Sequence, residues 1–227
     1  MEFENPKAFK QHLSKLNGEV IETVRETKLL GIHLTCDLSW NKNTKSIVKE
    51  SNQKMIFFHK VSQFTRNLSD LKRIYILQVR SKLEQSAVLW HFGLSRKNRS
   101  SLERVQKSAL KVILGKRYTS YSDALKKLKI ESLEDRRRSL CLKFAKQCLK
   151  VEKLKKLFKK DIKNHKMEKR KMDVFQVNRT KTERYKNSAI PQMQRMLNLH
   201  ENKRLEILKK ISMPVNYDSC KSLSLRK

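Results

Sequence analysis

Glycine and proline are scarce in this chain, which holds only four Gly and three Pro among 227 residues. A β-sandwich or barrel needs many tight turns, and these two residues form a large share of them, so the scarcity argues against an all-β fold. A flexible Gly-rich linker is excluded for the same reason. Long helices need neither residue, and the composition therefore predicts a mainly α-helical protein.

Metal-binding and catalytic patterns are missing as well. None of the four cysteines lies in a C-x-x-C pair and the histidines lack ligand spacing, so no zinc site is expected. Cys141 and Cys148 share one face of a predicted helix, and we interpret them as core residues, with His91 in a similar packing role. There is no Gly-rich phosphate loop, no G-x-S-x-G and no Asp-Asp pair to hold catalytic magnesium. The sequence indicates no active site of its own.

Long apolar runs are also missing. The first ten residues lack the apolar segment of a signal peptide, and no stretch is apolar for the length that spans a bilayer. We therefore expect an intracellular protein without a membrane span, in the nucleus or the cytoplasm, where thiols stay reduced.

Positive charge is what the chain has in excess. It carries 54 Lys and Arg against 22 Asp and Glu, a formal net charge of +32. This charge repels itself, and a polyanionic partner relieves the repulsion. Nucleic acid is the first candidate, because neutralised phosphates release counterions, and an anionic membrane surface is the second.

The excess of positive charge is densest over residues 143–171, where thirteen Lys and Arg face three Asp and Glu. A helix this basic, with a thin apolar stripe, fits a polyanion-binding arm or a segment that is only partly ordered alone. An interfacial amphipathic helix has the same pattern.

Strand-like residues are confined to the first part of the chain, over residues 11–35. Asn17-Gly18 is a hairpin-turn signal ahead of β-branched residues. The run Leu29–Leu34 is expected to form a buried strand with Gly31 inside it, where Gly indicates a bulge or a close backbone approach. Two strands alone are rarely stable in water, so other elements must cover this hairpin.

Helical spacing of apolar residues begins at Trp40 and continues to about residue 150. Ser69 is expected to cap a helix that ends at Gly93, and a third helix is expected over residues 97–114 with Gly115 as its C-terminal cap. Capping patterns at Ser120 and Ser132 open two more helices, and the last is expected to continue into the basic segment. Pro191 fits the first turn of a final helix.

Three stretches of sequence together resemble one family. They are KLLGIHLTCDLSW at residues 28–40, LERVQKSALKVILG with TSYSDALKKLKIESLEDRRRSLCLKF at 102–115 and 119–144, and VNRTKTERYKNSAIPQMQRMLN at 177–198. In this order and at these separations they resemble the C-terminal part of reverse transcriptases from jockey-like non-LTR retrotransposons of animals. The likeness covers nearly the whole chain.

The resemblance implies a fold and a domain order. It implies a mainly α chain with an N-terminal β-hairpin remnant of the palm sheet, followed by a helical bundle and a long basic helix. The corresponding regions are the palm tail with the primer-grip hairpin at 1–39, a thumb-like helical domain at 40–150, a basic arm at 151–190, and a C-terminal helix with its tail at 191–227.

Four residues match the family's hairpin motif K-[YFL]-L-G-[VI], which resembles the element that grips the 3′ end of the primer. They are Lys28, Leu30, Gly31 and Ile32. Because Gly31 has no side chain, a sugar-phosphate backbone could approach it closely, although the glycine would equally accommodate a plain bulge.

Three cations share one face of the expected third helix, namely Arg104, Lys107 and Lys111. In a thumb, such a face tracks phosphates of the template–primer duplex of RNA and DNA. An ordinary solvated helix face has the same composition, so the pattern leaves both interpretations open.

The chain differs from the family in what it lacks. The palm and fingers of the parent polymerase are missing, with their catalytic aspartates, the Mg²⁺ that belongs to them, and the endonuclease. Met1-Glu2-Phe3 resembles the middle of a palm strand. We therefore expect a truncated copy, an incomplete gene product or a domesticated remnant that binds nucleic acid without polymerising, and whose open strand edges promote association. The alternatives are a non-enzymatic basic RNA- or DNA-binding protein and a protein of anionic membrane surfaces.

Overall fold

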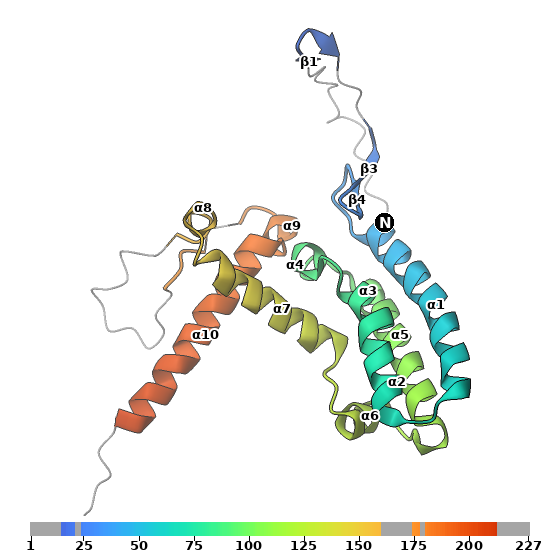
Figure 1. Cartoon of the computed structure of the whole chain (residues 1–227). Coiled ribbons are helices and arrows are strands. Elements are labelled where there is room, and N and C mark those ends of the chain that lie inside the picture. The colour runs from blue at the N-terminus through green and yellow to red at the C-terminus, as the bar shows by residue number, and fades with distance from the viewer. Residues whose placement is uncertain (1–14, 21–23, 160–173, 178–179, 213–227) are drawn as a thin grey trace, which may run out of the picture. The chain divides into compact units, whose positions relative to one another are not determined.

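The computed structural model describes residues 15–20, 24–159, 174–177 and 180–212. Its described part is mainly helical, with short antiparallel hairpins ahead of the helices, so the expected fold class is confirmed. The chain divides into two compact units (Figure 1). The first joins Met1–Gln85 to Leu94–Lys129, and the second joins Ser86–Gly93 to Ile130–Lys227.

Two short hairpins precede the helices of the first unit. Strand β1 (Lys15–Leu16) pairs with β2 (Glu19–Val20) around Asn17 and Gly18. Both turn residues have positive φ, 51° and 89°, which is what a type I′ turn requires. The predicted Asn-Gly turn is therefore confirmed. Strands β3 (Glu26–Leu29) and β4 (Ile32–Thr35) form the second hairpin.

The expected buried strand over residues 29–34 is wrong. Strand β3 ends at Leu29 and β4 begins at Ile32, so Leu30 and Gly31 form the connecting turn, with φ of 48° and 82°. Gly31 therefore lies in a turn and not in a bulge within a strand. Leu29 and Leu30 are exposed, and Ile32 is the buried residue of this stretch. The apolar pattern did not predict this turn, because leucine rarely adopts the left-handed conformation that Leu30 has here.

The body of the first unit is a bundle of helices that pack side by side (Figure 1). Helices α1 (Asn41–Phe64) and α5 (Arg96–Leu114) pack against each other and against a continuous helical segment. That segment consists of α2 (Leu68–Ile74), the π-helical η1 (Tyr75–Arg80) and α3 (Ser81–Glu84). Each helix buries one apolar stripe. The buried residues of these stripes include Ile47, Phe58, Leu71, Val79, Leu83, Leu102, Ala109 and Ile113.

Two side-chain hydrogen bonds join η1 and α5 to the start of the next helix. The Tyr75 hydroxyl in η1 donates to Gln106 Oε1 in α5 at 2.6 Å. Gln106 Nε2 in turn donates to the Tyr121 hydroxyl at 2.9 Å, at the start of α6 (Tyr121–Leu128). Burial raises the pKa of Tyr75 well above its ordinary value, so this hydroxyl keeps its proton.

Side-chain caps set the helix ends of the first unit. The Ser120 hydroxyl accepts from the Asp123 N–H at 3.2 Å, which confirms the predicted cap of α6. Gly115, with φ of 50°, ends α5 as predicted and begins the 3-10 turn η2 (Gly115–Arg117). The cap of α2 is Asn67, whose Oδ1 accepts from the Ser69 N–H at 3.0 Å. The expected Ser69 cap was therefore wrong, and Ser69 lies inside the helix.

The apolar stripe that predicted one helix from Ser69 to Gly93 spans a break. Helix α3 ends at Glu84, and Ser86 takes a left-handed conformation with φ of 53° before α4 (Ala87–Trp90). The chain passes from the first unit to the second at this point. The stripe continues on both sides because α3 buries Leu83 and α4 buries Ala87 and Trp90, so periodicity alone does not detect the break.

The second unit is built around α7 (Leu133–Cys148), which contacts both α4 and α10 (Ala189–Ser212). Two short helices, α8 (Glu152–Lys155) and α9 (Glu183–Lys186), lie between α7 and α10 in the sequence. One core cluster ties these elements together and consists of Ala145, Cys148, Phe158, Phe175, Met193 and Leu197.

Several predictions for this unit are confirmed. The Ser132 hydroxyl accepts from the Asp135 N–H at 3.1 Å and caps α7. Cys141 and Cys148 are buried and free, in the predicted core positions. Pro191 lies in the first turn of α10, where its missing N–H costs nothing.

The basic segment at 143–171 is not one continuous helix. Helix α7 ends at Cys148 and α8 covers only four residues, while residues 160–173 lie outside the described part. Residues 130–149 belong to the second unit, together with the C-terminal helix. The division between the units therefore falls at a different place from residue 150, where the sequence predicted that the helical domain ends.

A buried cation links α4 to α7. Arg137 is fully buried, its Nε donates to His91 Nδ1 at 3.5 Å, and its guanidinium lies 5.7 Å from the centroid of the Trp90 ring. His91 is buried in the same place, so its predicted packing role is confirmed.

Candidate nucleic-acid interface

The tip of the β3–β4 hairpin carries the four residues of the motif. Lys28 pairs with His33 across the hairpin, and Leu29 pairs with Ile32. Lys28 and Gly31 are exposed, and Leu30 is 89% exposed, whereas Ile32 is only 9% exposed. Ile32 therefore anchors the hairpin, and the other three residues are the ones that face solvent.

The hairpin is attached to the first turn of α1. The His33 N–H donates to Asn43 Oδ1 at 3.2 Å, and Asn43 is itself buried. Lys42 forms an ion pair with Glu26 across the same contact. These contacts position the hairpin tip over the helical body.

Polar residues of α1 and of the C-terminal end of α3 lie close to the tip. Lys82 Nζ lies 2.5 Å from Glu50 Oε2 and donates to Gln85 Oε1 at 2.6 Å. A Cβ added at Gly31 would lie 3.3 Å from Gln85 Nε2, so the turn approaches this group closely. The Lys82 hydrogen bond is the largest cause that lowers the pKa of Glu50, and the charge of Lys28 contributes. Sequence reasoning missed Lys82 and Gln85, because only folding brings α3 to the hairpin.

Helix α5 presents the three predicted cations together. Arg104, Lys107 and Lys111 are exposed, and Lys111 Nζ lies 5.5 Å from the centroid of the Tyr118 ring. The opposite face of the helix, which includes Leu102 and Ala109, is fully buried. Within the described residues no carboxylate forms an ion pair with any of the three cations. Their charge is therefore available to a partner.

Two further cations lie on α1 and were not predicted. Lys45 and Lys49 are exposed one turn apart, and no ion pair holds either of them within the described structure. The first turn of α5 lies beside that of α1, because Asn98 Nδ2 donates to Asn41 Oδ1 at 2.8 Å. The i, i+4 lysine spacing was a signal that could have found this pair.

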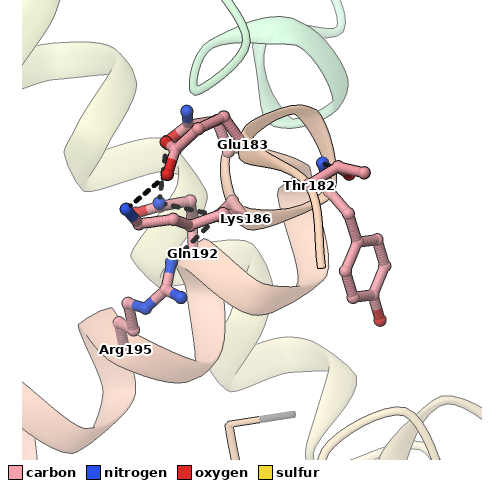
Figure 2. Close-up of polar contacts among 7 residues, drawn as sticks. Thr182, Glu183, Lys186, Gln192 and Arg195 are labelled. Carbon is pink, nitrogen blue, oxygen red and sulfur yellow. Dashed lines mark hydrogen bonds and ion pairs between the residues drawn. The ribbon is translucent and has the colours of Figure 1, made fainter. Parts of the chain in front are cut away.

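The second unit contains a polar turn between α9 and α10 (Figure 2). Gln192 and Arg195 reach back from α10, and both donate to the Lys186 carbonyl at 2.9 Å. Lys186 Nζ donates to Glu183 Oε1 at 2.8 Å. Thr182 caps α9, because its hydroxyl accepts from the Tyr185 N–H at 3.2 Å. These polar groups hold one another, so the cluster stabilises the turn and carries no argument for a ligand.

Among the described residues, no three His, Cys, Asp or Glu side chains gather into a metal-binding group. In the same part of the chain, no helix combines the length and the apolar character that crossing a bilayer requires.

Comparison with known proteins finds no family model, no curated protein and no solved structure that matches this chain.

Proposed function

We propose that this chain binds double-stranded nucleic acid, an RNA–DNA hybrid above all, through phosphate contacts of its first unit. In this proposal the chain corresponds to the primer-grip hairpin, thumb and C-terminal region of a jockey-like non-LTR reverse transcriptase. Polymerisation belongs to the palm that carries the catalytic aspartates and Mg²⁺. The observation that carries the proposal is the exposed, unpaired set of cations on α5.

The spacing of these cations suits a phosphate backbone. Arg104, Lys107 and Lys111 lie within an eight-residue stretch of helix, whose ends are about 10 Å apart along its axis. Phosphates of one duplex strand follow one another every ~3.4 Å along the duplex axis, so this stretch matches a run of about four phosphates. Contacts of this kind position a duplex without reading its bases.

A salt titration on an RNA–DNA hybrid tests the proposal. The slope of log K against log salt should be steep, and the triple replacement Arg104→Gln, Lys107→Gln, Lys111→Gln should reduce it by about 2–3. A matched control replaces three exposed cations that lie outside both α5 and the basic segment with Gln: Lys60, Arg66 and Arg73.

Two results would contradict the proposal. An affinity that does not change with salt excludes phosphate contacts, and an equal loss in both triple variants shows that net charge alone drives the binding. Incorporation of deoxynucleotides by the isolated chain would contradict the absence of polymerase activity.

A non-enzymatic basic nucleic-acid-binding protein is the second candidate function. The observation that favours it is that each unit has a buried core within its own residues. A chain of this kind should be stable and monodisperse when purified. The first candidate predicts association instead, because β3 and β4 have no further strand neighbours in the described structure. Light scattering on the purified chain separates the two.

A further inference from the structure

A groove lies between α1 and α5 in the first unit. Its volume is about 530 Å³, and its walls include Val48, Asn52 and Ile56 of α1 and Asn98 and Ser101 of α5. Grooves and pockets of about 300–1,000 Å³ are the size that proteins use for small organic groups. A base with its sugar and phosphate is such a group.

The walls of the groove offer the three kinds of contact that a nucleotide needs. Ile56, which is 63% exposed, and Val48 offer an apolar surface for the face of a base. The side-chain amide of Asn52 offers a donor and an acceptor for a base edge. Lys45 and Lys49 also line the groove, and their free charges suit a phosphate.

A buried hydroxyl in the groove has no partner in the protein. Thr44 is only 2% exposed and lines the groove, yet its Oγ1 makes no hydrogen bond. A buried polar atom without a partner destabilises the folded chain. Because this oxygen is shielded from solvent, a bound strand would contact the other residues that line the groove.

The groove lies next to the basic face of α5. Ser101 lines it, and Arg104 follows three residues later, so the two side chains are surface neighbours on the helix. A strand whose phosphates lie on Arg104 and Lys107 therefore passes the opening of the groove. A paired base presents only its edge to a protein, whereas an unpaired base can turn its whole face into such a groove.

We propose that the α1–α5 groove holds one unpaired nucleotide of the bound nucleic-acid strand. This inference rests on the proposed function, because it needs the strand to lie on α5. The chain should then prefer a duplex with an unpaired nucleotide over a fully paired one.

The test compares two probes, a blunt RNA–DNA hybrid and the same hybrid with one unpaired uridine in the RNA strand. Fluorescence anisotropy should show that the natural chain binds the second probe about tenfold more tightly, which is roughly the gain from one added hydrogen bond in the groove. Asn52→Glu places a carboxylate in the groove, which repels a phosphate and gives a base no ring to stack on. It should abolish this preference while leaving the affinity for the blunt hybrid within about twofold of that of its control variant.

Gln63→Glu is the matched control, since Gln63 is an exposed residue of α1 outside the groove and the change in charge is the same. It should keep the preference. The double variant Lys45→Gln, Lys49→Gln should weaken the preference without introducing a bulky side chain.

The outcomes separate the two proposals. If the natural chain binds both probes equally, the groove inference is wrong and the proposed function stands. If it binds neither, the proposed function fails first. A preference that survives Asn52→Glu places the unpaired nucleotide elsewhere and overturns the inference. Saturation by free uridine monophosphate, with no preference between the hybrids, would assign the groove to a soluble nucleotide and overturn the strand-bound version.

Discussion

Leu30 has a backbone conformation that destabilises the folded chain. Its φ is 48° and its side chain is 89% exposed. A left-handed leucine costs about 1–2 kcal/mol, and burial does not offset the cost here. Residues held in such conformations often serve function, which agrees with the place of Leu30 in the hairpin motif.

Leu30→Asn should therefore stabilise the first unit. It creates Asn-Gly, the preferred pair for this turn, and should raise the free energy of unfolding by about 0.5–1 kcal/mol. Urea denaturation followed by circular dichroism measures the change. Leu29→Asn is the control, because Leu29 is also exposed but lies in β3, where Asn is unfavourable. A loss of stability in Leu30→Asn would contradict this account of the turn.

The cysteines should differ strongly in reactivity. Burial raises the pKa of the Cys141 thiol to about 12 and also raises that of Cys148, whereas Cys36 is exposed. Thiolates are the reactive form, so iodoacetamide at neutral pH should modify Cys36 at least about a hundredfold faster than Cys141. Peptide mass spectrometry of the native chain gives the rates, with the urea-unfolded chain as control. Similar native rates at Cys36 and Cys141 would show that the α7 core is open.

At the scale of elements, one ion pair joins α1 to α3. Glu50 and Lys82 come from different helices, and the hydrogen bond between them lowers the pKa of Glu50. A lowered carboxyl pKa stabilises the fold above the ordinary value of 4.5, and this stabilisation is lost as pH falls through the pKa of the folded state.

Glu50→Gln should consequently lower the free energy of unfolding at pH 7. Because Glu50 is 40% exposed, the expected loss is only about 0.5 kcal/mol. The difference from the natural chain should shrink as the pH is lowered below about 4. Urea titrations across this pH range measure it. Lys82→Gln and the double variant complete a double-mutant cycle, and a coupling of zero would contradict the bridge.

The elements also show where sequence patterns succeed. Helix α5 was predicted within a residue or two, because its apolar stripe and its Gly115 terminus both depend on near neighbours. The break at Ser86 was missed, because the stripe runs through it. The turn at Leu30 was missed because leucine gives no turn signal.

At the scale of the whole molecule, like charges dominate. A net charge of +32 makes the folded chain repel itself more strongly than the expanded chain does. Salt shortens the screening length from about 10 Å at 0.1 M to about 3 Å at 1 M, which weakens this repulsion.

Raising the NaCl concentration should therefore raise the melting temperature of the chain by a few degrees. Differential scanning fluorimetry measures the shift. The variant with Gln at Lys60, Arg66 and Arg73 carries less charge and should gain less from salt. A melting temperature that falls with added NaCl would mean that attractive ion pairs outweigh the repulsion.

The charge excess, the helices and most of their caps were readable from the sequence alone, because they depend on composition and on residues a few positions apart. Tertiary structure decided which of these residues are available to a partner. Arg137 is buried against Trp90, whereas Arg104 and Lys107 stay exposed, although all three are cations on predicted helices. Burial depends on contacts between elements that are distant in the chain, and the local spacing of residues does not predict those contacts.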